Sequence, residues 1–284
     1  MENRCRIRNW LRRFGVQISF FYLGLGLAII LILSGTIYFF TASLLMNEMV
    51  SKTHDLLELS GNNIATYIAR VKGESDVFAN SPVLRQYLEE NDESLRPALM
   101  SGIEQLLKND DCKKSIVVVS KDGRILSNEE NLDMSVSEDM MKEDWYMESI
   151  HNTMPVLTGA RMQSFSPDKD NWVISVSTEI TDSAGENLGV LLMDMEYGVV
   201  EEHLRSLDVG REGYVFLVND RGELVYHKDT GFFTSPEKKE QLLTLLAEGD
   251  RYEKKKNLLV YQTEIEKTGW ILVGVASLDT LNTL

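Results

Sequence analysis

One uncharged stretch near the amino terminus constrains what this chain can be. Between Phe14 and Asn47 there is no Asp, Glu, Lys or Arg, and residues 16–40 are almost continuously apolar. As a helix rising about 1.5 Å per residue, this stretch would reach roughly 37 Å, enough to cross a hydrocarbon core of about 30 Å. We therefore expect a transmembrane helix over residues 14–40.

Two other structures use apolar stretches of this kind. A cleaved signal peptide has an apolar region of only about 7–15 residues, although Thr41-Ala42-Ser43 is similar to a small-residue cleavage site. A buried core helix rarely runs this long without a polar face. The length of the stretch favours the membrane anchor.

The charges beside the stretch predict its orientation. Five arginines lie within residues 1–13, opposed only by Glu2, and the first charge after the stretch is Glu48. Basic residues remain on the cytoplasmic side of a membrane. We therefore expect a cytoplasmic amino terminus in residues 1–13, and an extracellular remainder in a protein located in the cell membrane.

The acidic balance of the chain excludes some partners. The formal net charge is −15, and residues 1–13 contribute +4, which leaves −19 for the remainder. Such a charge would be repelled by nucleic acid and by an anionic membrane surface. Small solutes and other proteins remain as partners.

Chemistry-bearing motifs are missing from the sequence. Cys5 and Cys112 are expected on opposite sides of the membrane, so they cannot pair within one chain. There is no CxxC, HExxH or G-x-S-x-G pattern, and the four histidines are scattered. We expect no catalytic residues, no metal and no cofactor, so an extracellular enzyme is the weaker alternative.

Apolar residues at helical spacing continue after the membrane stretch. They predict a long helix from residue 41 to about residue 90 and a second helix over Ser94–Lys108, so residues 41–110 form one helical segment. The long helix could pack on its own domain or serve as a stalk that pairs with a second chain as a homodimer. Both arrangements can occur in one molecule, with the membrane end of the helix pairing with a second chain and the distal end packing on its own domain.

From residue 115 the apolar period changes to that of strands, in a pattern that occurs twice. Each copy reads hairpin, helix, hairpin, which predicts an α+β fold with two tandem antiparallel-sheet lobes. We place the membrane-distal lobe at residues 111–200 and the membrane-proximal lobe at 201–279, and expect residues 280–284 to start a truncated helix towards a second span. The predicted hairpins pair Ser115–Ser120 with Ile125–Asn128, Trp172–Ile180 with Leu188–Met195, Tyr214–Val218 with Glu223–His227, and Leu258–Ile265 with Trp270–Ala276.

The two copies differ in length. The first inserts residues 135–152, with an expected helix that carries Trp145 and Tyr146, followed by a strand over Val156–Ser164. The second has a single charged helix there, Pro236–Glu248. Extra structure over one face of a sheet is what a ligand pocket needs, so we expect the pocket in the distal lobe.

These features together resemble the double Cache family, the PAS-like extracellular sensor module of bacterial chemoreceptors, sensor histidine kinases and diguanylate cyclases. Asp144-Trp145-Tyr146 resembles the family's Trp-Tyr pair, and the segment 189–194 (GVLLMD) resembles its strand that ends in a ligand-binding acid. The segment 222–229 (GELVYHKD) resembles its Gly…His-Pro-Asp hairpin, with Lys228 where proline is usual. Members that bind amino acids carry an arginine two residues before the tryptophan, where this chain has Glu143.

The resemblance implies a small-molecule site in the distal lobe. Aromatic faces of Trp145 and Tyr146 can enclose a ligand and attract a cation. Asp194 could hold a ligand ammonium or form a structural ion pair with Arg161. Lys142 or Arg161 could replace the missing arginine. The candidate ligand-binding residues are Trp145, Tyr146, Arg161, Trp172 and Asp194. Trp172 is a weaker candidate than the others, as is Ser177, and Trp270 is assigned to the core.

The sequence therefore predicts the extracellular ligand-sensing module of a transmembrane receptor. The expected ligand is a small cationic or zwitterionic metabolite, such as an amine or amino acid, and the expected output is a helix shift across the membrane. A membrane-anchored structural or adhesive protein is the alternative.

Overall fold

The computed structural model describes residues 2–129, 132, 134–165, 172–204, 207, 209, 213–247, 249–253 and 258–277. The chain divides into two compact units, residues 1–52 and residues 53–284. The expected helix start at residues 280–284 lies outside the described residues.

The first unit is part of a single helix, α1 (Glu2–Ala79). Within the described residues, Phe21–Leu45 is the segment whose length and composition suit a membrane crossing, and none of it is buried inside the protein. The segment overlaps the predicted span over 14–40 and continues to Leu45. An exposed apolar surface of this length is consistent with a lipid environment.

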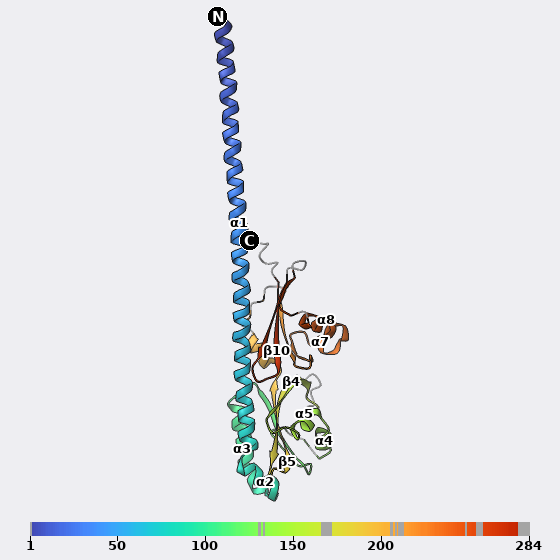
Figure 1. Ribbon diagram of the computed structural model, residues 1–284. Helices are drawn as coiled ribbons and strands as arrows, with labels where there is room; N and C mark the ends of the chain where they lie inside the picture. Colours follow the sequence, from blue (N-terminus) through green and yellow to red (C-terminus); the bar gives the residue numbers. More distant parts are fainter. Residues whose placement is uncertain are drawn as a thin grey trace. The chain divides into compact units, whose positions relative to one another are not determined.

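In the second unit, α1 packs along both sheets (Figure 1). Its buried side chains, at most 2 % exposed, recur at helical spacing: Leu57, Ile64, Ile68 and Val71. They share one core with side chains of each sheet. At Gly274 an added Cβ would lie 2.7 Å from Leu57 Cδ1, so this glycine permits the close approach of α1 to the second sheet. The helix therefore packs on its own domain, and pairing with a second chain remains a prediction.

The helix expected to run to about residue 90 is interrupted, which corrects the prediction. α1 ends at Ala79, and a separate helix α2 (Pro82–Glu90) begins after Ser81, whose side chain accepts the Leu84 N–H at 3.3 Å. Proline disfavours helical backbone at the residue before it but suits the first helical position. A short 3₁₀ turn (Glu93–Leu95) and α3 (Arg96–Lys108) follow, close to the predicted second helix.

The distal lobe is a five-stranded antiparallel sheet in the order β2-β1-β5-β4-β3. The predicted hairpins are confirmed, with Val118 opposite Leu126 in one and Val176 opposite Met193 in the other. Two short helices, α4 (Met134–Met140) and α5 (Asp144–Ser149), precede the edge strand β3. The strands are β1 (Lys113–Ser120), β2 (Ile125–Ser127), β3 (Val156–Met162), β4 (Trp172–Thr181) and β5 (Asn187–Glu196).

The proximal lobe repeats this arrangement after the connecting helix α6 (Gly198–Leu204). Its strand order, β7-β6-β10-β9-β8, is equivalent to that of the distal lobe, which confirms the duplication and the α+β fold class. Two helices, α7 (Gly231–Thr234) and α8 (Pro236–Ala247), lie between its hairpins. The strands are β6 (Tyr214–Asn219), β7 (Leu224–His227), β8 (Arg251–Glu253), β9 (Leu258–Ile265) and β10 (Trp270–Ser277).

The proximal lobe also corrects one expectation. We predicted only a helix in place of the distal insertion and its strand, yet the three-residue strand β8 pairs with β9 and takes the position that β3 has in the distal sheet. The short strand follows α8 directly and has no clear period of two, so sequence patterning did not identify it.

Each sheet has two covered faces. One face of each packs against α1 in the shared core. The opposite distal face packs against α4 and α5 through Met140 and Trp145, and the opposite proximal face packs against α8 through Leu242. The faces that point away from α1 are therefore where small helices cover a sheet, as a ligand site requires.

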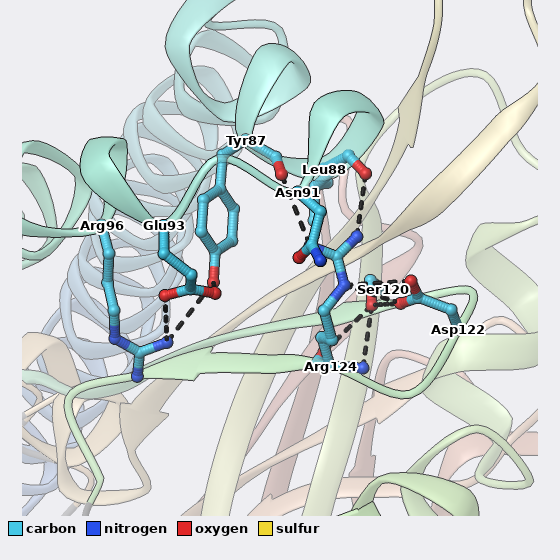
Figure 2. Close-up of polar contacts among 8 residues, drawn as sticks. All are labelled: Tyr87, Leu88, Asn91, Glu93, Arg96, Ser120, Asp122 and Arg124. Carbon is cyan, nitrogen blue, oxygen red and sulfur yellow. Dashed lines mark hydrogen bonds and ion pairs between the residues drawn. The ribbon is translucent and has the colours of Figure 1, made fainter.

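Arg124 fastens the end of α2 to the turn between β1 and β2 (Figure 2). Its guanidinium donates to the Leu88 carbonyl at 2.8 Å and to Asn91 Oδ1 at 2.6 Å, and its Nε donates to Asp122 Oδ2 at 3.0 Å. The last carbonyls of a helix have no partner within the helix, and a cation there also interacts favourably with the helix dipole. The contact therefore secures the outer end of the distal lobe.

We expect Arg124→Ala to lower the free energy of unfolding by about 1–3 kcal/mol, since several charge-assisted hydrogen bonds are lost. Amides of α2 should also exchange faster in hydrogen exchange. Lys108→Ala is the control, because the Lys108 side chain is 77 % exposed and pairs with Glu104 at 3.6 Å on the surface, so its loss should cost less than about 1 kcal/mol. Equal losses for the two variants would contradict this account.

Candidate functional site

The distal face that points away from α1 carries most of the predicted binding residues. Strand register makes Ser115 and Ser175 the direct neighbours of Asp194 on either side. Because side chains alternate along a strand, these three residues share a face with Val117 and Leu192, which pack against Trp145. A polar row therefore crosses an otherwise apolar surface.

The Asp194 carboxylate is fully buried and accepts four hydrogen bonds. Oδ1 accepts from Arg161 Nη2 at 2.7 Å and from Ser175 Oγ at 2.6 Å. Oδ2 accepts from Gln163 Nε2 at 2.8 Å and from Ser115 Oγ at 3.2 Å. A buried charge needs such partners, so in this state Asp194 belongs to an ion pair with Arg161.

Arg161 reaches Asp194 from the edge strand β3. The register of β3 against β4 shifts between Thr158 and Arg161, and such a bulge re-aims a side chain. Arg161 Nε donates to Ser175 Oγ at 2.9 Å, while Nη1 makes no hydrogen bond among the described residues and lies 3.9 Å from Glu143 Oε2. One buried donor of this guanidinium is thus unsatisfied.

Trp145 and Tyr146 on α5 form the aromatic side of the same region. Trp145 is 1 % exposed, its ring centroid lies 5.9 Å from the Arg161 guanidinium carbon, and its Nε1 donates to Glu143 Oε2 at 3.1 Å. Burial raises the pKa of the Tyr146 phenol, and the charge of Glu179 acts in the same direction. The structure therefore brings Trp145, Arg161 and Asp194 together, with Tyr146 beside the tryptophan.

Three other predicted residues have different positions. Trp172 lies at the junction of the lobes, with its ring centroid 4.7 Å from that of Phe233, and does not join the Asp194 cluster. Ser177 donates to the Trp145 carbonyl at 3.0 Å, so it links β4 to α5. Lys142 pairs with Asp139 at 3.0 Å on the surface. Of the two residues expected to replace the family's arginine, it is therefore Arg161 that lies at Asp194. Trp270 is 2 % exposed in the core, as expected.

Sequence reasoning missed Ser115, Gln163 and Ser175 as partners of Asp194. The serines at 175 and 177 alternate with apolar residues in an otherwise buried strand, and this period of two was the available signal. Gln163 follows the bulge in β3, so no period could place it. Among the described residues, no group of three His, Cys, Asp or Glu side chains is placed to hold a metal ion.

Tyr197 joins the two lobes at the end of β5. Its hydroxyl accepts the His227 N–H at 2.7 Å and donates to the His227 carbonyl at 2.9 Å, while its ring packs on Tyr226. The His227 imidazole is 5 % exposed and stacks on Phe232, with ring centroids 3.8 Å apart. Tyr197, three residues after Asp194, therefore connects the end of β5 to the proximal lobe by direct contacts.

Two equivalent antiparallel lobes on one shared helix define a tandem PAS-like fold. The sequence model of the Cache domain, dCache_1, matches residues 41–283. The chain therefore belongs to the double Cache family of sensor domains.

Solved structures with the same fold are ligand-binding domains of bacterial chemoreceptors. The sensory domain of Campylobacter jejuni Tlp3 with isoleucine bound has a TM-score of 0.62 at 16 % identity, covering 86 % of this chain and 98 % of that one. The Pseudomonas fluorescens CtaA domain with L-isoleucine has 0.62 at 15 %, covering 85 % and 98 %. The Pseudomonas aeruginosa PctB domain with L-Arg has 0.64 at 16 %, covering 84 % and 99 %. A comparison with curated protein sequences finds no match.

We expect Arg161→Met to lower the free energy of unfolding by about 3–5 kcal/mol, because it leaves the Asp194 carboxylate buried without its cation. Chemical denaturation of Arg161→Met, Asp194→Leu and the double variant should give a coupling energy of about 1–3 kcal/mol. Lys142→Met, which removes an exposed ion pair, is the control and should cost less than about 1 kcal/mol. Strict additivity of the two losses would show that the pair is not formed.

The buried imidazole of His227 should make the stability of the fold depend on pH. Burial lowers the pKa of its imidazole, an effect that Lys238 strengthens and Asp229 opposes. The unfolded chain therefore binds this proton more readily, so the contribution of His227 to stability is lost as the pH falls below the unfolded value of about 6.5. Unfolding measured between about pH 7.5 and pH 5 should show a smaller decline in His227→Gln than in the wild type. Parallel declines would contradict the burial of this ring.

Proposed function

We propose that this chain is the sensory module of a membrane-anchored receptor, and that its distal lobe binds a small zwitterionic or cationic metabolite. The observation that carries the proposal is the buried Arg161–Asp194 pair beside Trp145 and Tyr146, on the covered face of a Cache-family sheet. Trp145, Tyr146, Arg161 and Asp194 are its proposed ligand-binding residues. Trp172 is proposed for the lobe junction instead.

The chemistry of the pair favours a ligand with both charges. The carboxylate of Asp194 is saturated by protein donors, so a ligand ammonium must displace Arg161 from it. The displaced guanidinium, which already has one unsatisfied nitrogen, then needs an acceptor such as a ligand carboxylate. A zwitterion supplies both groups in one molecule, and the amino acids in the similar solved structures are zwitterions.

Signalling is proposed to pass through α1. Residues 53–79 of this helix pack on both sheets, so a shift of either lobe changes the contacts of one element that continues towards the apolar segment. A ligand shifts such an equilibrium only by its differential affinity for two states, typically about 1–3 kcal/mol. We propose that the receptor is a homodimer paired through the stalk helix, with an extracellular sensor and a cytoplasmic amino terminus, and that this chain has no catalytic activity of its own.

Ligand binding is tested by calorimetric titration of the full chain in lipid nanodiscs against amines, amino acids and purines. We expect saturable binding of one class, weakened at least about tenfold in Asp194→Asn and in Trp145→Phe, since each removes a direct contact. Trp270→Phe is the matched control, because Trp270 is a buried tryptophan of the other lobe. Wild-type affinity in both distal variants would remove these residues from the site.

Transmission is tested by disulfide cross-linking of single cysteines placed along residues 45–60, in a background without Cys5 and Cys112. The ligand found by titration should change the cross-linking rates of neighbouring positions by unequal factors, because a helix that shifts or rotates brings different faces together. Unchanged rates at every position would contradict a moving stalk.

A further inference from the structure

A second ion-pair network lies on the other face of the distal sheet, against α1. The Lys113 side chain at the start of β1 is 0 % exposed, pairs with Glu74 of α1, and donates to the Leu106 carbonyl at 3.3 Å. Arg70, one turn earlier on α1, donates to Glu74 Oε1 at 3.3 Å and to Asp110 Oδ2 at 2.7 Å. The charges of these four side chains balance, and we call Arg70, Glu74, Asp110 and Lys113 the α1 network.

A bulge in β1 separates this network from the Asp194 cluster by only two residues. Side chains at positions i and i+2 of a regular strand share a face, so Lys113 and Ser115 would point the same way. The register of β1 against β5 shifts between them, however, with Lys113 opposite Met195 and Ser115 opposite Asp194. The bulge therefore directs Lys113 towards α1 and Ser115 towards Asp194 on the opposite face.

The Ser115 hydroxyl is one of the groups that hold Asp194. It donates to Asp194 Oδ2 at 3.2 Å and accepts from Gln163 Nε2 at 2.8 Å, and the residue is 0 % exposed. A ligand ammonium at Asp194 would compete for this carboxylate, so the hydroxyl would have to release it or follow it. Because protein interiors are close-packed, such a rearrangement displaces the backbone of β1 instead of being absorbed by empty space.

Lys113 would carry this displacement to α1. Its ammonium is fully buried, and a buried charge without its partner is costly, so Lys113 and Glu74 have to move together. Glu74 lies five residues before the end of α1 at Ala79. Because the ends of helices fray, a contact at Glu74 controls how firmly this end of α1 is held.

We propose that Lys113 and Glu74 are positioning residues, which convey the state of the Asp194 carboxylate on one face of the distal sheet to α1 on the other. The route runs from Asp194 through Ser115 and the bulge in β1 to Lys113. This role rests on the proposed function, because it takes Asp194 as part of the ligand site. It adds the contact by which that site acts on the helix.

The test is hydrogen exchange, followed by mass spectrometry, in the full chain in lipid nanodiscs without any ligand. Ser115→Ala removes one hydrogen bond to Asp194 and should speed exchange of the amides in residues 70–79 of α1 at least about threefold. Ser177→Ala is the matched control, because Ser177 is also a fully buried serine of this sheet but donates to the Trp145 carbonyl. It should leave exchange in α1 within about 1.5-fold of the wild type.

A second background shows whether the effect passes through the α1 network. Lys113→Met combined with Glu74→Met replaces the buried pair by apolar side chains, while Arg70 keeps its partner Asp110, so no buried charge is left unpaired. In this background Ser115→Ala should change exchange in α1 by less than about 1.5-fold.

Glu74→Gln provides a milder background that preserves more of the packing. Its amide oxygen can still accept from Lys113, while the charge that holds the ammonium is lost. Ser115→Ala should there lose at least about half of its effect on α1 exchange.

Lys108→Met combined with Glu104→Met is the control background, because it removes an exposed Lys–Glu pair of α3, and Ser115→Ala should keep its full effect in it. Unchanged α1 exchange in Ser115→Ala, an equal change in Ser177→Ala, or the same effect of Ser115→Ala with and without the Lys113–Glu74 pair would each overturn the proposal. Because no ligand is present, a failure of metabolite binding leaves these outcomes unaffected, so the two failures are distinguishable.

Discussion

The burial of one face of α1 against both sheets is the constraint on which the second unit depends. Neither lobe has a core of its own on that side, since Ile64, Ile68 and Val71 share a cluster with strands from the distal and the proximal sheet. The backbone of β10 comes close enough to Leu57 that Gly274 leaves no room for a side chain. Because the two lobes share one helix, movement of either lobe against α1 would change side-chain contacts in this common core.

Because α1 covers one face of each sheet, the opposite face is the one left for a ligand site. The opposite faces are covered by short helices, α5 in the distal lobe and α8 in the proximal lobe, and a cavity between the lobes lies beside both. Arg161 stands where these regions meet: it is bonded to Asp194 on the distal face and lines the cavity towards the proximal lobe. Tyr197 forms a second link, through both backbone groups of His227.

The sequence predicted the features that depend on local period and composition. The four hairpins, the duplication and the helix that carries Trp145 and Tyr146 follow from alternation, turn residues and helical spacing. It could not predict the break at Ser81, where a proline and a capping serine override a continuous apolar period. The ion pair between Asp194 and Arg161 was one of two predicted alternatives, and the structure shows it at 2.7 Å. Gln163 could not be placed, since it follows a bulge in β3. Trp172 has the aromatic side chain expected of a pocket residue, but its position at the start of β4 puts it at the lobe junction.

The central claim is that Arg161 forms an ion pair with Asp194 inside the distal lobe, and that a ligand bound there changes this ion pair. Nuclear magnetic resonance of the arginine side chains, with Arg161 assigned by substitution, tests this directly. The account predicts a slowly exchanging Arg161 Nε–H signal, because Nε donates to Ser175 while Nη2 of the same guanidinium donates to Asp194, and this signal should shift when a binding metabolite is added. A rapidly exchanging signal like that of an exposed arginine, or a signal that ignores a saturating ligand, would contradict it.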